Sequence, residues 1–361
     1  MTEESQPERS RWARSWPWVK RLLLVVASLL AARFIVSFVG AIDWAAVGES
    51  LGRLSVVQFA ILGLVLSVRQ LLNAVPLARF VPELSLGRSL QNDLSANLIG
   101  TIAPPPGDIV LRVSMFRSWG VDPIVGMAGV TLNTLAFYVI RFVAPAVGLV
   151  VLSVQGFERG QVVAALGALA IAAAIVVALV LIARGDRFAH FVGQRAGRVI
   201  GRFRHTVDPE VWARAVVDFR ALMSRTIKTG LPPSLVALQA MVLTDAFLLF
   251  LALRFVGVGS GSLSTVDIFG AFLLAYPLTL LPLFGFGILD AALLATWVEI
   301  GGLSIEPEVV AALGVWRAYT LLGPLLVGGP VLLLWRRSTT PEDSAIEGLG
   351  DDIQAREAPR S

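Results

Sequence analysis

The sequence APPPGD at residues 103–108 interrupts one hydrophobic stretch of the chain, and LPLFGFG at residues 281–287 interrupts another. Each interrupted stretch is too short to cross a bilayer. Hydrocarbon cannot hydrogen-bond a free N–H or C=O, so non-helical backbone persists at membrane depth only where protein buries it or where it lines a wet cavity. The two breaks fall in corresponding places of the two halves of the chain, and paired breaks of this kind are typical of a transport site.

The composition around these breaks is that of a membrane protein. Of the 361 residues, 56% are hydrophobic and 16% are charged, and the mean hydropathy is +0.75. Soluble domains typically hold ~45–50% apolar residues. The sequence therefore predicts an all-α polytopic membrane protein with about six full spans. These spans are expected at residues 21–42, 55–75, 124–153, 161–183, 234–256 and 309–335.

The inventory of reactive side chains excludes several kinds of chemistry. The chain has no cysteine, which excludes disulfides, thiolate nucleophiles and Cys-ligated metals. Its two histidines, His190 and His205, lie in a basic polar stretch and not in a span. We therefore expect no metal and no cofactor.

The distribution of Lys and Arg predicts the orientation. Basic residues cluster in one group of segments: before the first span, after the second span, between residues 184 and 228, and at Arg336 and Arg337. The other group holds only two basic residues, Arg53 and Arg159, and consists of the segments 43–54, 155–160, 257–267 and 299–308. The first group is expected in the cytoplasm, with both termini inside. Because basic residues flank the spans, anionic lipid headgroups are the expected partner at that face, and nucleic acid is not.

This orientation is consistent only if residues 90–119 enter and leave from the cytoplasm and residues 268–300 enter and leave from outside. Each segment would then be a re-entrant hairpin, opposed to the other in an inverted repeat of halves 20–153 and 161–337. The alternative is that each hairpin is a pair of ordinary tilted spans. If each hairpin is counted as one span, the domain has eight.

The remaining regions flank or connect this single membrane domain, residues 20–337. Residues 1–19 are expected to form a cytoplasmic tail and residues 338–361 a disordered acidic tail. In the linker 184–230, Asp208 and Pro209 have the pattern of a helix start, and apolar residues recur at helical spacing opposite arginines. Two amphipathic helices are expected here, lying either in the inner headgroup layer or on the cytoplasmic face of the domain.

Two groups of residues resemble signatures of a known family, the transmembrane, flippase-like part of the lysylphosphatidylglycerol synthases. The first group is residues 97–104, Gly107, Arg112 and Gly120, followed by a helix with Arg141. The second is a Pro, a Gly-rich turn, an acidic residue opening a helix, and an Arg on a later helix, here Pro282, Gly285, Gly287, Asp290 and Arg317.

The resemblance implies a protein of the bacterial inner membrane that moves lipids or lipid-linked molecules between leaflets. Two departures from the family pattern matter. Asp290 stands where the family pattern has Glu, and its shorter side chain reaches less far. Only a short acidic tail follows Arg337, so we expect no aminoacyl-transferase domain, no synthase activity and no enzyme.

Charged residues within the spans are the candidate site, because each costs ~2.5–3.5 kcal/mol at a helix centre and needs a partner or a function. We expect them to form a polar cavity at mid-membrane that accepts a phospholipid-type headgroup, with arginines binding phosphate oxygens and glycines and helix N-termini offering N–H groups. The expected substrate-binding residues are Arg69, Asn97, Gly107, Asp108, Arg112, Arg141, Gly285, Gly287, Asp290 and Arg317.

The alternative for these arginines is internal ion pairing, for example Arg141 or Arg317 with Asp290, or Arg69 with Asp108. Asp245 is a candidate for proton coupling, or else a paired carboxylate without that role. Arg254 lies nearer a span end, where its side chain is expected to snorkel to the headgroups.

Three functions remain open from the sequence. Lipid translocation is favoured, and a secondary transporter of a small anionic solute shares the same architecture. An intramembrane lipid-modifying enzyme or aspartyl protease is less well supported, because Asp290 follows the second glycine of its turn by three positions and no third motif accompanies it. A homo-oligomer is compatible with all three.

Overall fold

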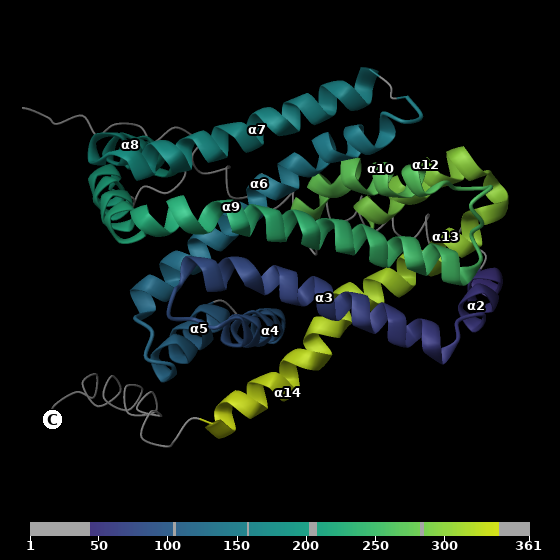
Figure 1. The fold of residues 1–361 in the computed structure, drawn as a ribbon, viewed down its shortest axis with the longest axis horizontal. Coiled ribbons are helices and arrows are strands. Elements are labelled where there is room, and N and C mark those ends of the chain that lie inside the picture. The colour runs from purple at the N-terminus through teal and green to yellow at the C-terminus, as the bar shows by residue number, and fades with distance from the viewer. Residues whose placement is uncertain (1–43, 104–105, 157–158, 202–207, 282–284, 339–361) are drawn as a thin grey trace, which may run out of the picture.

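A computed structural model describes residues 44–103, 106–156, 159–201, 208–281 and 285–338, and every regular element in these ranges is helical (Figure 1). The all-α prediction is confirmed for this part of the chain. The predicted first span at residues 21–42 and both predicted tails lie outside the described residues.

Five helical segments are long and apolar enough to cross a membrane, and they match the five remaining predicted spans. They are α3 (Val56–Phe80), α6 (Pro123–Leu152), α7 (Arg159–Arg184), the second half of α9 (Pro209–Val256), and the segment Leu303–Ser338. This last segment comprises η2 (Leu303–Ile305), α13 (Glu306–Arg317), the π-helical turn η3 (Ala318–Leu322) and α14 (Gly323–Ser338).

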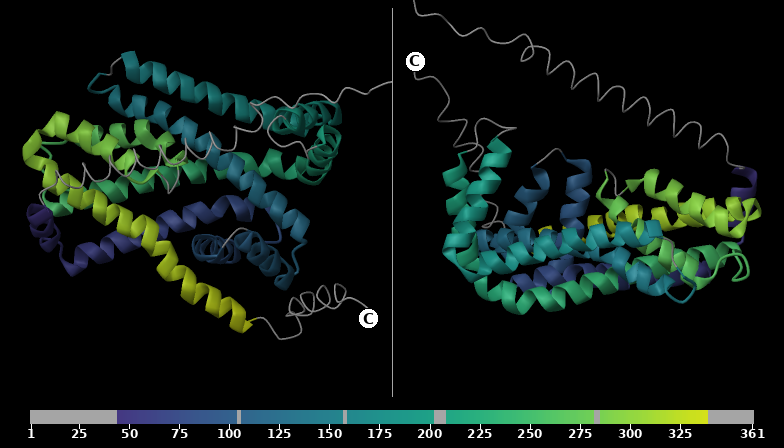
Figure 2. Two further views of the ribbon diagram at one scale, coloured as in Figure 1. Left: turned by 180° about the vertical axis from the view of Figure 1, so that it is seen from behind. Right: turned by 90° about the horizontal axis from the view of Figure 1, so that it is seen from above.

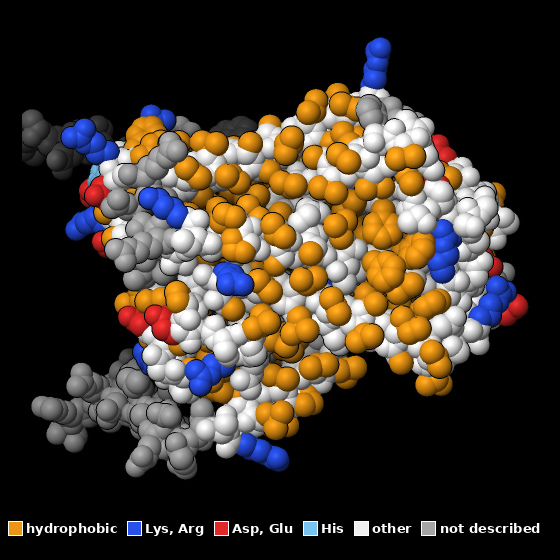
Figure 3. All heavy atoms as spheres, in the orientation of Figure 1, with side chains coloured by type: hydrophobic (Ala, Val, Ile, Leu, Met, Phe, Trp, Pro, Cys, Tyr) orange, Lys and Arg blue, Asp and Glu red, His pale blue; other side chains and the backbone are white. Residues whose placement is uncertain are grey.

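Helix α9 lies at the centre of the bundle and packs against α3, α6, α7, α13 and α10 (Thr265–Ala275). Its inner side chains Met241 and Leu248 are fully buried, as are Phe272 of α10 and Trp297 of α12 (Ile288–Gly301). Apolar side chains cover most of the middle of the visible face, and charges gather toward its ends (Figure 3). An apolar belt of this kind is the surface that a bilayer requires.

The prediction of a linker helix separate from the fifth span is wrong, because α9 is one continuous helix of 48 residues. The start at Asp208 and Pro209 is as predicted, with the Asp208 side chain accepting a hydrogen bond from the N–H of Glu210. The helix runs through Pro232 and Pro233. Each proline removes a backbone donor. Directly after them the Ser234 hydroxyl donates to the carbonyl oxygen of Gly230, 2.7 Å away.

The second predicted amphipathic helix is α8 (Asp186–Gly201), which packs along α9. At their closest approach a Cβ on Gly193 would lie 2.6 Å from the Cα of Ala213. Only a glycine allows helices to come this close. Ala213 belongs to the first half of α9, the other predicted amphipathic helix, so this contact joins the two linker helices and both predicted placements stay predictions.

The first predicted hairpin consists of α4 (Leu86–Ile102) and α5 (Gly107–Ser118), which pack against each other. It begins four residues earlier than predicted because the Ser85 side chain caps α4 by accepting from the N–H of Arg88. Figure 2 shows this hairpin standing across the long helices instead of along them.

The second hairpin consists of α10, the 3-10 turn η1 (Tyr276–Leu280) and α12, and it runs alongside the long helices (Figures 1 and 2). Its turn uses Gly285 at φ +70° and Gly287 at φ +83°, values that favour glycine. The first hairpin therefore lies across the long helices and the second lies along them. The inverted repeat of the two halves stays a prediction.

The distribution of Lys and Arg predicts that several helix ends face the cytoplasm, and in the structure these ends lie together. The C-terminal ends of α3, α7 and α14 and the N-terminal ends of α6 and α9 all lie at the left of Figure 1, with α8. Helix α2 (Trp44–Gly52) lies at the opposite end.

Candidate functional site

A polar cavity of about 140 Å³ lies among α3, α4, α6, α9, η1 and the segment Leu303–Ser338. Arg69 enters it near the middle of α3, so the cavity lies at mid-depth of the bundle. The π-helical turn η3 borders it, and such turns occur often at functional sites. Its charged and polar lining consists of Arg69, Gln70, Asn73, Asp93, Asn97, Arg141, Asp245, Tyr276, Thr279, Trp316, Arg317 and Thr320.

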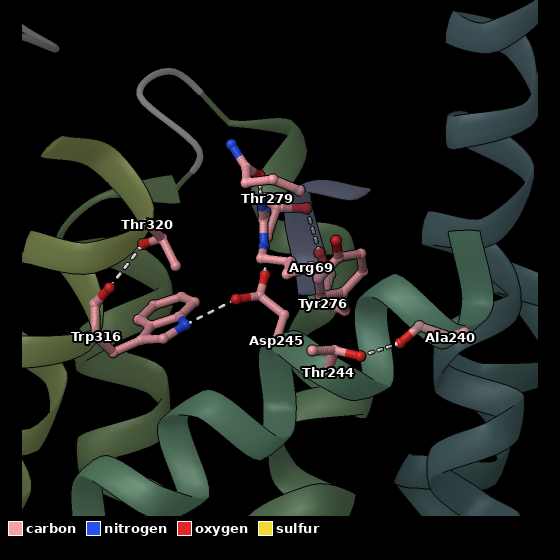
Figure 4. Close-up of polar contacts among 9 residues, drawn as sticks. Arg69, Ala240, Thr244, Asp245, Tyr276, Thr279, Trp316 and Thr320 are labelled. Carbon is pink, nitrogen blue, oxygen red and sulfur yellow. Dashed lines mark hydrogen bonds and ion pairs between the residues drawn. The ribbon is translucent and has the colours of Figure 1, made fainter. Parts of the chain in front are cut away.

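Asp245 of α9 connects two walls of this cavity (Figure 4). Its Oδ2 lies 3.3 Å from Nη2 of Arg69, and its Oδ1 accepts a hydrogen bond from Nε1 of Trp316 at 2.9 Å. Nη1 of Arg69 also donates to the Oε1 of Gln70 at 2.7 Å. The predicted pair of Arg69 with Asp108 is therefore wrong, since Asp108 lies at the hairpin turn beside Gly100. Asp245 is a paired carboxylate, and its role in proton coupling stays a prediction.

A second ion pair joins Arg317 to Asp290, with 2.8 Å between Nε and Oδ1. The other carboxylate oxygen of Asp290 accepts a hydrogen bond of 2.7 Å from the N–H of Gly287, which caps α12. The predicted pairing of Arg317 with Asp290 is confirmed. The sequence analysis expected N–H groups at this helix end to bind an anion. The N–H of Gly287 donates to Asp290 instead.

A third pair joins the two helices of the first hairpin about halfway along them, where Nη1 of Arg112 is 3.0 Å from Oδ1 of Asp93 and also donates to the side chain of Asn92. Asp93 lines the cavity and was missed from the sequence, although an acid within a predicted hairpin was a usable signal, as it was for Asp108. Gln70 and Trp316 were missed too, and each directly adjoins a predicted arginine.

Arg141 of α6 differs from the other three arginines. It makes no ion pair or hydrogen bond with any residue that the structure describes, and its Nε is buried without a partner. Its guanidinium lies 4.6 Å from the ring centre of Phe137 and 5.9 Å from that of Tyr138. These rings attract a cation but leave its charge unneutralised. The predicted alternative of an Arg141–Asp290 pair is wrong, because Asp290 binds Arg317.

The other predicted residues divide between the cavity and the hairpin turns. Asn97 lines the cavity beside Asn73, and neither side chain makes a hydrogen bond with a described residue, so both offer amide donors. The predicted residues that do not line the cavity are Gly107, Asp108, Arg112, Gly285, Gly287 and Asp290. The Arg254 guanidinium donates to the carbonyl oxygens of Val258 and Leu263 beyond the end of α9, so its side chain extends to the span end, and its contact with headgroups stays a prediction.

The described residues contain no cluster of three or more His, Asp or Glu that could hold a metal ion. No protein-family model matches the chain, and no curated protein matches it. The resemblance to the lysylphosphatidylglycerol synthase transmembrane family therefore rests on the sequence motifs alone. The arrangement itself can hold an anion, since the cavity combines an unneutralised guanidinium with free amide groups.

Proposed function

We propose that this protein moves an anionic lipid between the leaflets of a membrane, with the headgroup bound in the polar cavity. The observation that carries the proposal is Arg141, a cation with no carboxylate partner in the described structure, facing a cavity at mid-depth. A charge at this depth costs ~2.5–3.5 kcal/mol, and a bound anion would offset that cost. Guanidinium binds phosphate oxygens in bidentate geometry, which makes a phosphate ester the best-matched anion.

The three ion pairs around Arg141 support this assignment. Asp245 and Asp93 line the same cavity, and their unpaired charges would repel an anion. Their arginine partners lie within 3.3 Å and 3.0 Å, so both carboxylates are neutralised locally. Arg317 also lines the cavity and is paired with Asp290 at 2.8 Å, so an anion that enters the cavity meets one net positive charge, at Arg141.

The size of the cavity fits a headgroup and not a whole lipid. Its volume of about 140 Å³ is below the ~300–1,000 Å³ that is typical of sites enclosing complete small molecules. In the proposed mechanism the phosphate crosses through the cavity while the acyl chains stay in the bilayer. The same volume also suits a small free anion, which keeps a secondary transporter of an anionic solute as the second candidate.

The proposed location is the bacterial inner membrane, with both termini in the cytoplasm and no enzymatic activity. The clustering of the basic helix ends at one end of the bundle supports the orientation. The bacterial assignment depends on the family resemblance.

Purified protein in vesicles that contain a fluorescent phosphatidylglycerol tests the proposal, with dithionite reporting the label in the outer leaflet. Loss of a hydrogen bond to a charged group costs ~1.5–3 kcal/mol, so Arg141→Ala should slow translocation about ten- to hundredfold. Arg254→Ala removes an arginine from a span without touching the cavity and is the matched control. A folded Arg141→Ala protein that translocates at the wild-type rate would refute the proposal. Uptake of inorganic phosphate into the same vesicles would instead favour the solute transporter.

A further inference from the structure

A second hollow adjoins the polar cavity, between α3, α4 and α14. It has a volume of about 220 Å³, and its lining is almost entirely apolar. We call it the lateral groove. An apolar space of this kind stays dry, so its natural occupant is another apolar group.

The lateral groove and the polar cavity share four lining residues: Gln70, Leu90, Leu94 and Pro324. Gln70 marks the boundary, because its amide oxygen accepts a hydrogen bond from Arg69 on the cavity side. A molecule with a polar head and an apolar tail could therefore occupy both spaces at once.

The groove opens among side chains on the outside of the bundle. Leu71 of α3 is 43% exposed and Val327 of α14 is 50% exposed, and both line the groove. Because these helices belong to segments apolar enough to span a membrane, exposed positions at this depth face hydrocarbon.

The local packing of α14 keeps this groove narrow. A Cβ on Gly328 would lie 2.7 Å from the carbonyl oxygen of Leu94, so α14 touches α4 there. Five residues earlier, a Cβ on Gly323 would lie 2.5 Å from the side chain of Leu66, so α14 touches α3 there as well. A partner helix is about 10 Å across and would not enter such a space, whereas a single hydrocarbon chain is thin enough.

We propose that the lateral groove holds an acyl chain of the lipid whose headgroup occupies the polar cavity. The inference rests on the proposed function and deepens it, because it assigns the substrate to the chain-bearing phosphate esters and excludes a free anion. It also places the lateral portal of the substrate between α3, α4 and α14.

Filling the groove from its exposed rim tests this inference without disturbing the core. The variants Leu71→Trp and Val327→Trp place a large ring at the groove. Val68→Trp and Leu326→Trp are matched controls, because these residues are 44% and 75% exposed on the same two helices and do not line the groove. The assay is the translocation of chain-labelled fluorescent phosphatidylglycerol, run beside Arg141→Ala.

The inference predicts that both groove variants translocate lipid at least about tenfold more slowly, a loss of ~1.4 kcal/mol, while both controls stay near the wild-type rate. If the groove variants match their controls while Arg141→Ala is slow, the groove assignment falls and the proposed function stands. If Arg141→Ala is also unaffected, both fall.

A photo-crosslinking residue in place of Leu71 identifies the occupant directly. Crosslinking to phospholipid in vesicles supports the proposal. A crosslink to a second copy of the chain, or to another segment of the same chain, would overturn it.

Discussion

Replacing Asp245 by Asn should destabilise the protein strongly, because it leaves Arg69 charged and without its carboxylate. The two side chains lie 3.3 Å apart and are only 5% and 17% exposed. Removing one partner of a buried ion pair costs ~3–5 kcal/mol. The Asn side chain keeps an oxygen that can accept the hydrogen bond from Trp316, so the loss reports the charge and not the hydrogen bond.

A double-mutant cycle isolates the pair. We expect Arg69→Gln alone to cost a similar amount, because it strands the carboxylate, and the double variant Arg69→Gln/Asp245→Asn to cost less than the two single variants added together. The expected interaction energy is about 2–3 kcal/mol, near the upper end for contacting residues because both side chains are largely buried. The free energy of unfolding can be measured by titration with denaturing detergent in mixed micelles, followed by tryptophan fluorescence.

The exposed pair of Arg53 and Glu49 is the matched control. Its side chains lie 3.3 Å apart, as in the buried pair, but are 48% and 76% exposed. Exposed pairs are worth ~0–1 kcal/mol. Additive costs for Arg69→Gln and Asp245→Asn, as small as those of the control pair, would refute the reasoning that Asp245 neutralises a buried arginine.

Two further predictions concern close backbone contacts. Gly285→Ala should lower the free energy of unfolding more than Gly287→Ala. Both glycines have a positive φ, but only at Gly285 would the new methyl lie 2.5 Å from a backbone carbonyl oxygen. Equal losses, each near the ~1–2 kcal/mol of conformational strain alone, would contradict this prediction. Gly328→Ala should destabilise by ~1–3 kcal/mol through the contact of α14 with α4, whereas Gly329→Ala, with open space around it, should be neutral or slightly stabilising in the same unfolding titration. Similar effects at both positions would show that α14 does not press on α4.

The helices that are long and apolar enough to cross a membrane could be predicted from the sequence, because length and apolar composition alone identify them. The start of α9 was also readable, since Asp208 with Pro209 has a recognisable capping pattern. The continuity of α9 through Pro232 and Pro233 was not readable, because those prolines suggest an interruption that tertiary packing overrides.

Ion pairing in the cavity was harder to predict than the identity of the charged residues. Arg69 and Asp245 are separated by 176 positions, and no local pattern indicates that they meet. Arg141 was predicted as a site residue, but its lack of a partner became visible only when the other arginines were matched with Asp93, Asp245 and Asp290. The lateral groove depends on the crossing of α14 over α4, which local sequence does not encode.

An experimental structure of the protein in an anionic phospholipid bilayer is the most direct test of the proposed headgroup site. The prediction is a phosphate group at a hydrogen-bonding distance of about 2.7–2.9 Å from the guanidinium of Arg141, with a chain leaving through the lateral groove. An Arg141 that is paired with a carboxylate of the protein itself, in a cavity that no lipid headgroup enters, would contradict the proposal.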